Sequence, residues 1–226
     1  LHLSIRRQRQ MCIRDSGFAT YGKKLTITSS LYYRYMTNMI QRVKDIDSNG
    51  VATITWSNVD EAHFYGLELM TIYKPFRWWR IMASVNFSQS VIKSTSGESE
   101  LNNSGYSWSS NMTQTFTFSK GWSSQLTGFY RSPMILTQGR SQPMYSRDLA
   151  IKKTFLKDKM YVNFKVSDIF NTRQFGFTTS QDGVFNSTGI WKHQSRRFMV
   201  TIGYVFGNQD PDRKRREPRV DGGGDM

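Results

Sequence analysis

The chain has 226 residues, a formal net charge of +14 and an aromatic content of 14%. Apolar residues make up only 38%, which is low for a packed globular core, but the many aromatic residues argue against a disordered chain. No stretch approaches the roughly 18 consecutive apolar residues of a transmembrane helix, and the single cysteine, Cys12, cannot form an internal disulfide. Membrane-spanning strands are compatible with this composition, since each needs only about 9 to 11 residues of alternating character.

Residues 1–16 have no hydrophobic period, and residues 11–16 resemble a translated sequencing-adapter scar. We therefore predict that residues 1–16 are not native to the protein and leave them out of the fold analysis. From residue 24 onward, alternating apolar and polar residues predict about eight strands, because successive side chains of a strand point to opposite faces. These strands cover residues 24–45, 51–73, 79–95, 106–119, 122–130, 148–155, 160–171 and 191–206.

The alternation is clearest in residues 160–167 and in the last predicted strand. A helix fits poorly there, because the helical-face positions after Met160 include the polar residues Asn163 and Ser167. One face of these strands carries apolar side chains, which are Met160, Val162, Phe164, Val166, Phe198, Val200, Ile202, Tyr204 and Phe206. The opposite face carries polar ones, which include Tyr161, Asn163, Lys165, Ser167 and Thr201.

The connections between the predicted strands alternate in length. Those near residues 74–77, 120–121 and 157–158 are short, whereas those near residues 48, 102, 139 and 183 are mostly longer and richer in polar residues and glycine. Short turns at one rim and long loops at the other are typical of an outer-membrane barrel, and Greek-key sandwiches lack this order. Aromatic residues also gather toward strand ends, as they do at membrane interfaces.

These patterns predict an all-β fold, an antiparallel up-and-down transmembrane β-barrel wall with about eight strands of a larger barrel. The apolar face would meet lipid, and the polar face would line a water-filled lumen. The alternative is a large soluble β-sheet protein, in which the apolar face would pack against a second protein layer. Residues 17–207 would form the barrel part, and the polar residues 208–226 a disordered periplasmic tail.

Three segments resemble the C-terminal barrel part of TonB-dependent outer-membrane receptors of Gram-negative bacteria. They are Gly66-Leu67-Glu68-Leu69, the hairpin of residues 149–171 with its continuation Thr172-Arg173, and residues 197–207. The resemblance covers roughly residues 17–207. It implies a barrel of about 22 strands, a plug domain, and energised uptake of a scarce nutrient through contact with the TonB complex. The plug and the TonB-contacting region would lie N-terminal to this chain.

Two other functions fit the same patterns. The first is a passive porin or a surface adhesin, which has no energised transport. The second is a soluble carbohydrate-binding β-protein, which would be recovered without detergent. The sequence contains no nucleophile elbow, no phosphate-binding glycine loop and no cysteine pair, so we expect neither an enzyme nor a cofactor.

Two sets of residues are candidates for a site. Asp60, Glu61, His63 and Glu68 bring carboxylates near a histidine, but they lack zinc-ligand spacing, and we interpret them as polar strand residues rather than a metal site. Aromatic residues of the long loops and upper lumen could contact a transported metal chelate, glycan or peptide. These residues are Trp108, Tyr145, Phe175, Phe177 and Trp191.

The basic residues gather at both rims of the predicted barrel, and this does not suit a nucleic-acid site, which needs basic residues on one face with stacking aromatics. Cations at the rims would instead meet outer-membrane lipid phosphates and, outside, lipopolysaccharide. The predicted long-loop set is Arg131, Arg140, Arg147, Arg173, Lys192, Arg196 and Arg197.

Overall fold

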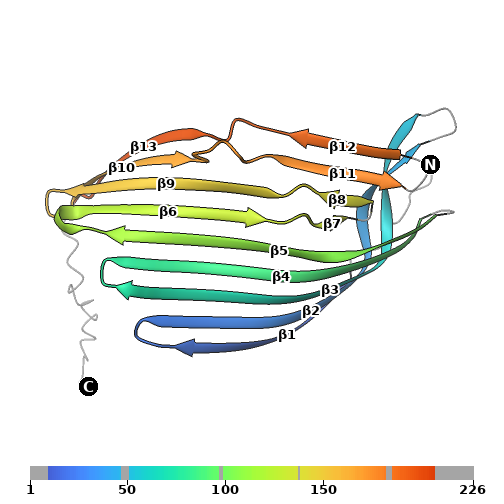
Figure 1. The fold of residues 1–226 in the computed structure, drawn as a ribbon, viewed down its shortest axis with the longest axis horizontal. Coiled ribbons are helices and arrows are strands. Elements are labelled where there is room, and N and C mark those ends of the chain that lie inside the picture. Colours follow the sequence, from blue (N-terminus) through green and yellow to red (C-terminus); the bar gives the residue numbers. More distant parts are fainter. Residues whose placement is uncertain (1–9, 47–50, 97–98, 137, 182–184, 207–226) are drawn as a thin grey trace, which may run out of the picture.

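The computed structural model describes residues 10–46, 51–96, 99–136, 138–181 and 185–206. A nine-stranded antiparallel sheet has the order β1-β2-β3-β4-β5-β6-β9-β10-β13, and a second sheet has the order β12-β11-β8-β7 (Figure 1). The strands of the larger sheet are β1 (Gln10–Tyr21), β2 (Leu25–Ile46), β3 (Ala52–Phe76), β4 (Trp79–Ser96), β5 (Ser99–Thr117), β6 (Trp122–Arg131), β9 (Met144–Phe155), β10 (Met160–Ser167) and β13 (Arg197–Tyr204). Those of the smaller sheet are β7 (Ile135–Leu136), β8 (Gly139–Ser141), β11 (Phe175–Gln181) and β12 (Phe185–Trp191).

The predicted all-β, up-and-down architecture is confirmed, and the eight predicted strands correspond to β2–β6, β9, β10 and β13. The structure adds β1, which pairs along β2 from Gln10 opposite Thr37 to Tyr21 opposite Thr26. β1 contains part of the segment set aside as non-native, and the origin of residues 1–16 stays a prediction. Residues 1–9 and the predicted tail, 208–226, lie outside the described residues. Within the described residues, no helix has the length and apolarity needed to span a membrane.

Two predictions about the long-loop end were wrong. The last strand does not run unbroken over residues 191–206, because β12 ends at Trp191 and β13 begins at Arg197. Five polar or charged residues, 192–196, separate them, and the Ser195 hydroxyl turns to donate a hydrogen bond to Asp168. The long connections near residues 139 and 183, predicted as loops, contain the strands of the smaller sheet.

The register divides the larger sheet into two faces of different chemistry, because residues opposite each other on neighbouring strands share a face. Val162 lies opposite Ile202 and Phe164 opposite Val200, so these side chains form one apolar face. They are open to the surroundings: Phe164 is 42% exposed, Val200 63% and Ile202 66%. No second layer of the described chain covers this apolar face. The opposite, polar face carries Asn163 opposite Thr201.

Aromatic residues form two rows on the apolar face. Trp108 lies 4.4 Å from Tyr130 between ring centroids in the row toward the long loops, and Trp79 lies 5.8 Å from Phe116 in the row near the short turns. Eight residues separate the two rows on each of four strands, or about 26 Å along a strand. That spacing is of the order of the ~25 Å apolar band between the aromatic girdles of an outer-membrane barrel. The four pairs are Tyr65 and Tyr73, Phe87 and Trp79, Trp108 and Phe116, and Tyr130 and Trp122.

The buried core is small and lies on the polar face, toward the long loops. It consists of Met36, Met39, Ala62 and Ile92, against which Phe64 and Ile135 pack. Ile135 belongs to β7 and lies over Gly105 of β5, where an added Cβ would come within 2.7 Å of it. Asn103 of β5 fixes the same connection, because its side-chain amide donates to the carbonyls of Leu136 at 2.7 Å and Gly139 at 3.2 Å. The connection between β6 and β9 is thus folded onto the polar face.

Two tyrosines of the polar face lie flat over glycines of the next strand. Tyr32 covers Gly66, where an added Cβ would meet the ring at 2.2 Å, and Tyr161 covers Gly203 in the same way. Glycine weakens a strand by leaving a gap, and the neighbouring ring fills that gap. These pairs therefore contribute packing to a sheet that has little buried core.

We expect the substitution Gly66→Val in the full-length protein to lower its free energy of unfolding by about 1–3 kcal/mol, because the Tyr32 ring must leave its place. The matched control is Gly128→Val, since an added Cβ at Gly128 meets no heavy atom within 4 Å. Urea unfolding in lipid vesicles measures both. Equal stability of the two variants would contradict this account.

Candidate functional site on the polar face

A hollow of about 350 Å³ lies on the polar face, where β5, β6 and β9 meet the loop that follows β10. The alternation of each strand brings these side chains to one face, because residues two apart in a strand point the same way. The lining combines polar and charged groups with two apolar side chains; it consists of Asn111, Thr127, Phe129, Met144, Ser146, Asp148 and Arg173.

One cation, Arg173, and one carboxylate, Asp148, line this hollow, and Lys165 adds a second cation beside it. The Arg173 guanidinium donates to the Ser146 hydroxyl at 2.8 Å, and the Lys165 ammonium lies 3.6 Å from the Asp148 carboxylate. Further along the same face, the Lys152 ammonium lies 4.4 Å from the centre of the Tyr161 ring. The hollow can therefore offer hydrogen-bond donors and positive charge to a polar or anionic solute.

Asp168 organises the loop behind the hollow. Its side chain is fully buried, and its carboxylate accepts hydrogen bonds from the Thr172 and Arg173 backbone N–H groups, at 3.0 and 2.9 Å, and from the Thr172 and Ser195 hydroxyls. Burial raises the pKa of this carboxyl group, but the hydrogen bonds outweigh burial and lower the pKa to about 2. The Asp168 N–H in turn donates to Asp148 at 2.9 Å, which ties this loop to the hollow.

The structure separates Glu68 from Glu61 and His63, whose carboxylate oxygen and ring nitrogen Nε2 lie 3.7 Å apart. Glu68 lies on the polar face, where it accepts a hydrogen bond from Asn86 at 2.7 Å. Glu61 and His63 lie on the apolar face, because their partners on β2 belong to that face. The Tyr33 hydroxyl lies 2.9 Å from His63 Nδ1. The Asp60 side chain lies outside the described part. Within the described residues, no three His, Cys, Asp or Glu side chains are grouped to hold a metal ion.

The five predicted ligand-contact residues lie in two places. Trp108 and Tyr145 share the apolar face, where Tyr145 is opposite Tyr130. Phe175, Phe177 and Trp191 come together in the smaller sheet, with the Phe177 and Trp191 ring centroids 4.9 Å apart. Phe175 and Trp191 are 49% and 45% exposed, so this aromatic cluster is open to a partner. The contact role of all five residues stays a prediction.

The sequence model of the outer membrane protein beta-barrel family matches residues 14–204. This span includes the two-faced sheet and the hollow. The protein belongs to this family. No curated protein and no solved structure matches the chain.

Membership of the outer-membrane barrel family confirms two predictions, the barrel-wall fold and the location in the cell outer membrane. The remaining predictions name a specific function within this family, and the family match does not choose between functions. Energised transport with TonB, a passive pore and an adhesive surface barrel are all compatible with it.

Sequence reasoning missed Asp168 and Ser195, which hold the loop behind the hollow, and it named Arg173 only as a rim cation. The segment Ser167-Asp168-Ile169-Phe170-Asn171-Thr172-Arg173 did stand out as a family-like motif. An aspartate that caps backbone N–H groups four and five residues later was the signal available in that motif. The Ser195 contact joins residues 27 apart in sequence, so no local sequence pattern predicts it.

We expect Asp168→Asn to lower the free energy of unfolding of the full-length protein by about 2 kcal/mol near neutral pH. Because the folded pKa of Asp168 lies near 2, below the ordinary value of 3.8, the carboxylate stabilises the fold above pH ~4 and loses this effect as pH falls toward 2. Unfolding in lipid vesicles between pH 7 and 2 tests this. The difference between wild type and variant should shrink with acid, and the matched control, Asp158→Asn in the exposed short turn, should change stability at pH 7 by less than Asp168→Asn.

Proposed function

We propose that the protein is the C-terminal barrel part of a TonB-dependent outer-membrane transporter that takes up a scarce nutrient, a metal chelate, glycan or peptide. The supporting observation is one continuous sheet with an uncovered apolar face and a polar face that carries a hollow lined by polar and charged side chains. The family-like motifs in residues 66–69, 149–173 and 197–207 favour the receptor branch over other barrels.

In this proposal the two faces meet different solvents. The apolar face contacts acyl chains through Met160, Val162, Phe164, Val166, Phe198, Val200, Ile202, Tyr204 and Phe206. The polar face lines the water-filled lumen with Tyr161, Asn163, Lys165, Ser167 and Thr201. β1 and β13 are the edges of the described sheet, and in lipid every strand edge must be paired. Further strands would therefore complete the barrel.

The proposed ligand path begins at the aromatic cluster of Phe175, Phe177 and Trp191 and passes the hollow beside Arg173 and Lys165. Exposed rings bind sugars or chelates by stacking, and the cations of the hollow favour anionic groups. A plug domain inside the lumen and the TonB complex in the periplasm would supply gating and energy. The chain described here would contribute wall and loops.

A passive porin is the second candidate, and one observation favours it. The connection between β6 and β9 folds onto the polar face and is fixed there by Ile135 and Asn103. A loop folded into the lumen narrows a pore without any plug.

Two measurements on the full-length protein separate these functions. For a transporter we expect the protein to bind the purified periplasmic domain of TonB, by isothermal titration calorimetry, and to give no steady conductance in planar bilayers. A porin would conduct without binding TonB. Conductance without TonB binding, or the absence of both, would contradict energised transport.

A further inference from the structure

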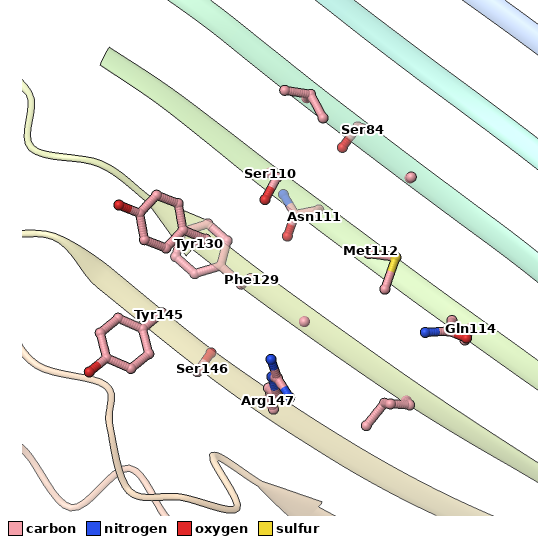
Figure 2. Close-up of a pocket in the computed structure, with 14 residues that line it drawn as sticks. Ser84, Ser110, Asn111, Met112, Gln114, Phe129, Tyr130, Tyr145, Ser146 and Arg147 are labelled. Atoms are coloured by element: carbon pink, nitrogen blue, oxygen red, sulfur yellow. The ribbon is translucent and has the colours of Figure 1, made fainter.

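A groove of about 670 Å³ crosses the apolar face over β4, β5, β6 and β9 (Figure 2). The groove arises where small side chains occur in one row across the strands. In this row the register places Ala83, Met112, Gly128 and Arg147 side by side on successive strands. Two of these four side chains are small. Gly128 forms an open floor, since an added Cβ would meet no heavy atom within 4 Å. The lining is mostly apolar, as a site for a hydrocarbon chain requires.

The groove ends at the aromatic row nearer the long loops. Tyr130 of β6 and Tyr145 of β9 lie opposite each other there, two residues beyond Gly128 and Arg147, as Figure 2 shows. Tyrosines of such a row mark the level of the lipid headgroups, where the ring is buried and the hydroxyl stays hydrated. One end of the groove therefore lies close to the headgroups, and its floor lies within the apolar band.

Arg147 is the charged group of this groove. Its side chain is exposed, and in the part of the chain that the structure describes, its guanidinium has no hydrogen bond or ion pair. Lys153, on the same strand and face, is satisfied internally. Its ammonium donates to the Lys120 carbonyl and lies 5.1 Å from the centre of the Trp122 ring. A charge without a partner in the protein is costly beside hydrocarbon, so we expect an anionic group of a membrane lipid to pair with Arg147.

We infer that this groove binds a phosphorylated lipid of the outer leaflet, the lipid A part of lipopolysaccharide, with an acyl chain over Gly128 and a phosphate on Arg147. A guanidinium matches phosphate geometry with two parallel hydrogen bonds. The inference rests on the apolar face meeting lipid, and it holds whether the barrel is a transporter or a porin.

The test uses the full-length protein in detergent, with lipid A as the probe and native mass spectrometry as the readout. We expect Arg147→Gln to weaken lipid A binding about tenfold, because the neutral amide keeps at most one of the two hydrogen bonds and loses the charge. We expect Gly128→Leu to weaken binding of lipid A at least as much, because the new side chain occupies the floor, where its Cβ meets no heavy atom within 4 Å. Lipid A without its phosphates should bind wild type and Arg147→Gln equally.

Two matched variants complete the test. Thr71→Leu adds the same side chain to the apolar face outside the groove, and Arg77→Gln removes an exposed arginine from the short turn between β3 and β4. Both should bind lipid A as wild type does. Wild-type binding by folded Gly128→Leu, or equal losses in the two matched variants, would overturn the inference. A changed oligomeric state in Gly128→Leu with unchanged lipid A binding would assign the groove to a second copy of the chain and overturn it too.

Discussion

The structure depends on the register of its hydrogen-bonded strands. Because side chains alternate with a period of two, a slip of one residue between neighbours would exchange the apolar and polar faces. From β1 to β13 the pairing keeps the faces aligned, so that Val162 faces the same side as Ile202, and Leu126 the same side as Leu149. The membrane strengthens this constraint, since backbone groups in hydrocarbon have only the neighbouring strand for a partner.

The apolar face is uncovered, and specific contacts on the polar face hold the rest of the structure in place. Near the long loops, a small core around Ala62 and Ile92 packs on the polar face and receives Ile135. Asp168 fastens the adjoining loop with hydrogen bonds that include one from Ser195. Along the wall, Tyr161 fills the space left by Gly203. These contacts place charged groups beside one hollow and leave the opposite face to lipid.

The sequence predicted the features that follow from the alternation of apolar and polar residues. The eight strands, the two faces of residues 160–167 and the short turns follow from a period of two and from turn residues, and these carried the prediction of a barrel wall. The smaller sheet was missed because its strands are as short as Ile135–Leu136, and its pairing joins segments far apart in the chain. The predicted ligand contacts Trp108 and Tyr145 were selected as loop and lumen aromatics, but strand parity puts them on the apolar face with Tyr130.

The two faces of this wall meet different surroundings: one contacts lipid and the other contacts water. Nitroxide labels on single cysteines at Val162, Asn163, Phe164 and Lys165, in full-length protein with Cys12 replaced by serine and reconstituted in vesicles, test it directly. The nitroxide's collision rate with dissolved oxygen should be high at positions 162 and 164. Its collision rate with a water-soluble nickel chelate should be high at positions 163 and 165. Equal access of the nickel chelate to all four positions would contradict the claim.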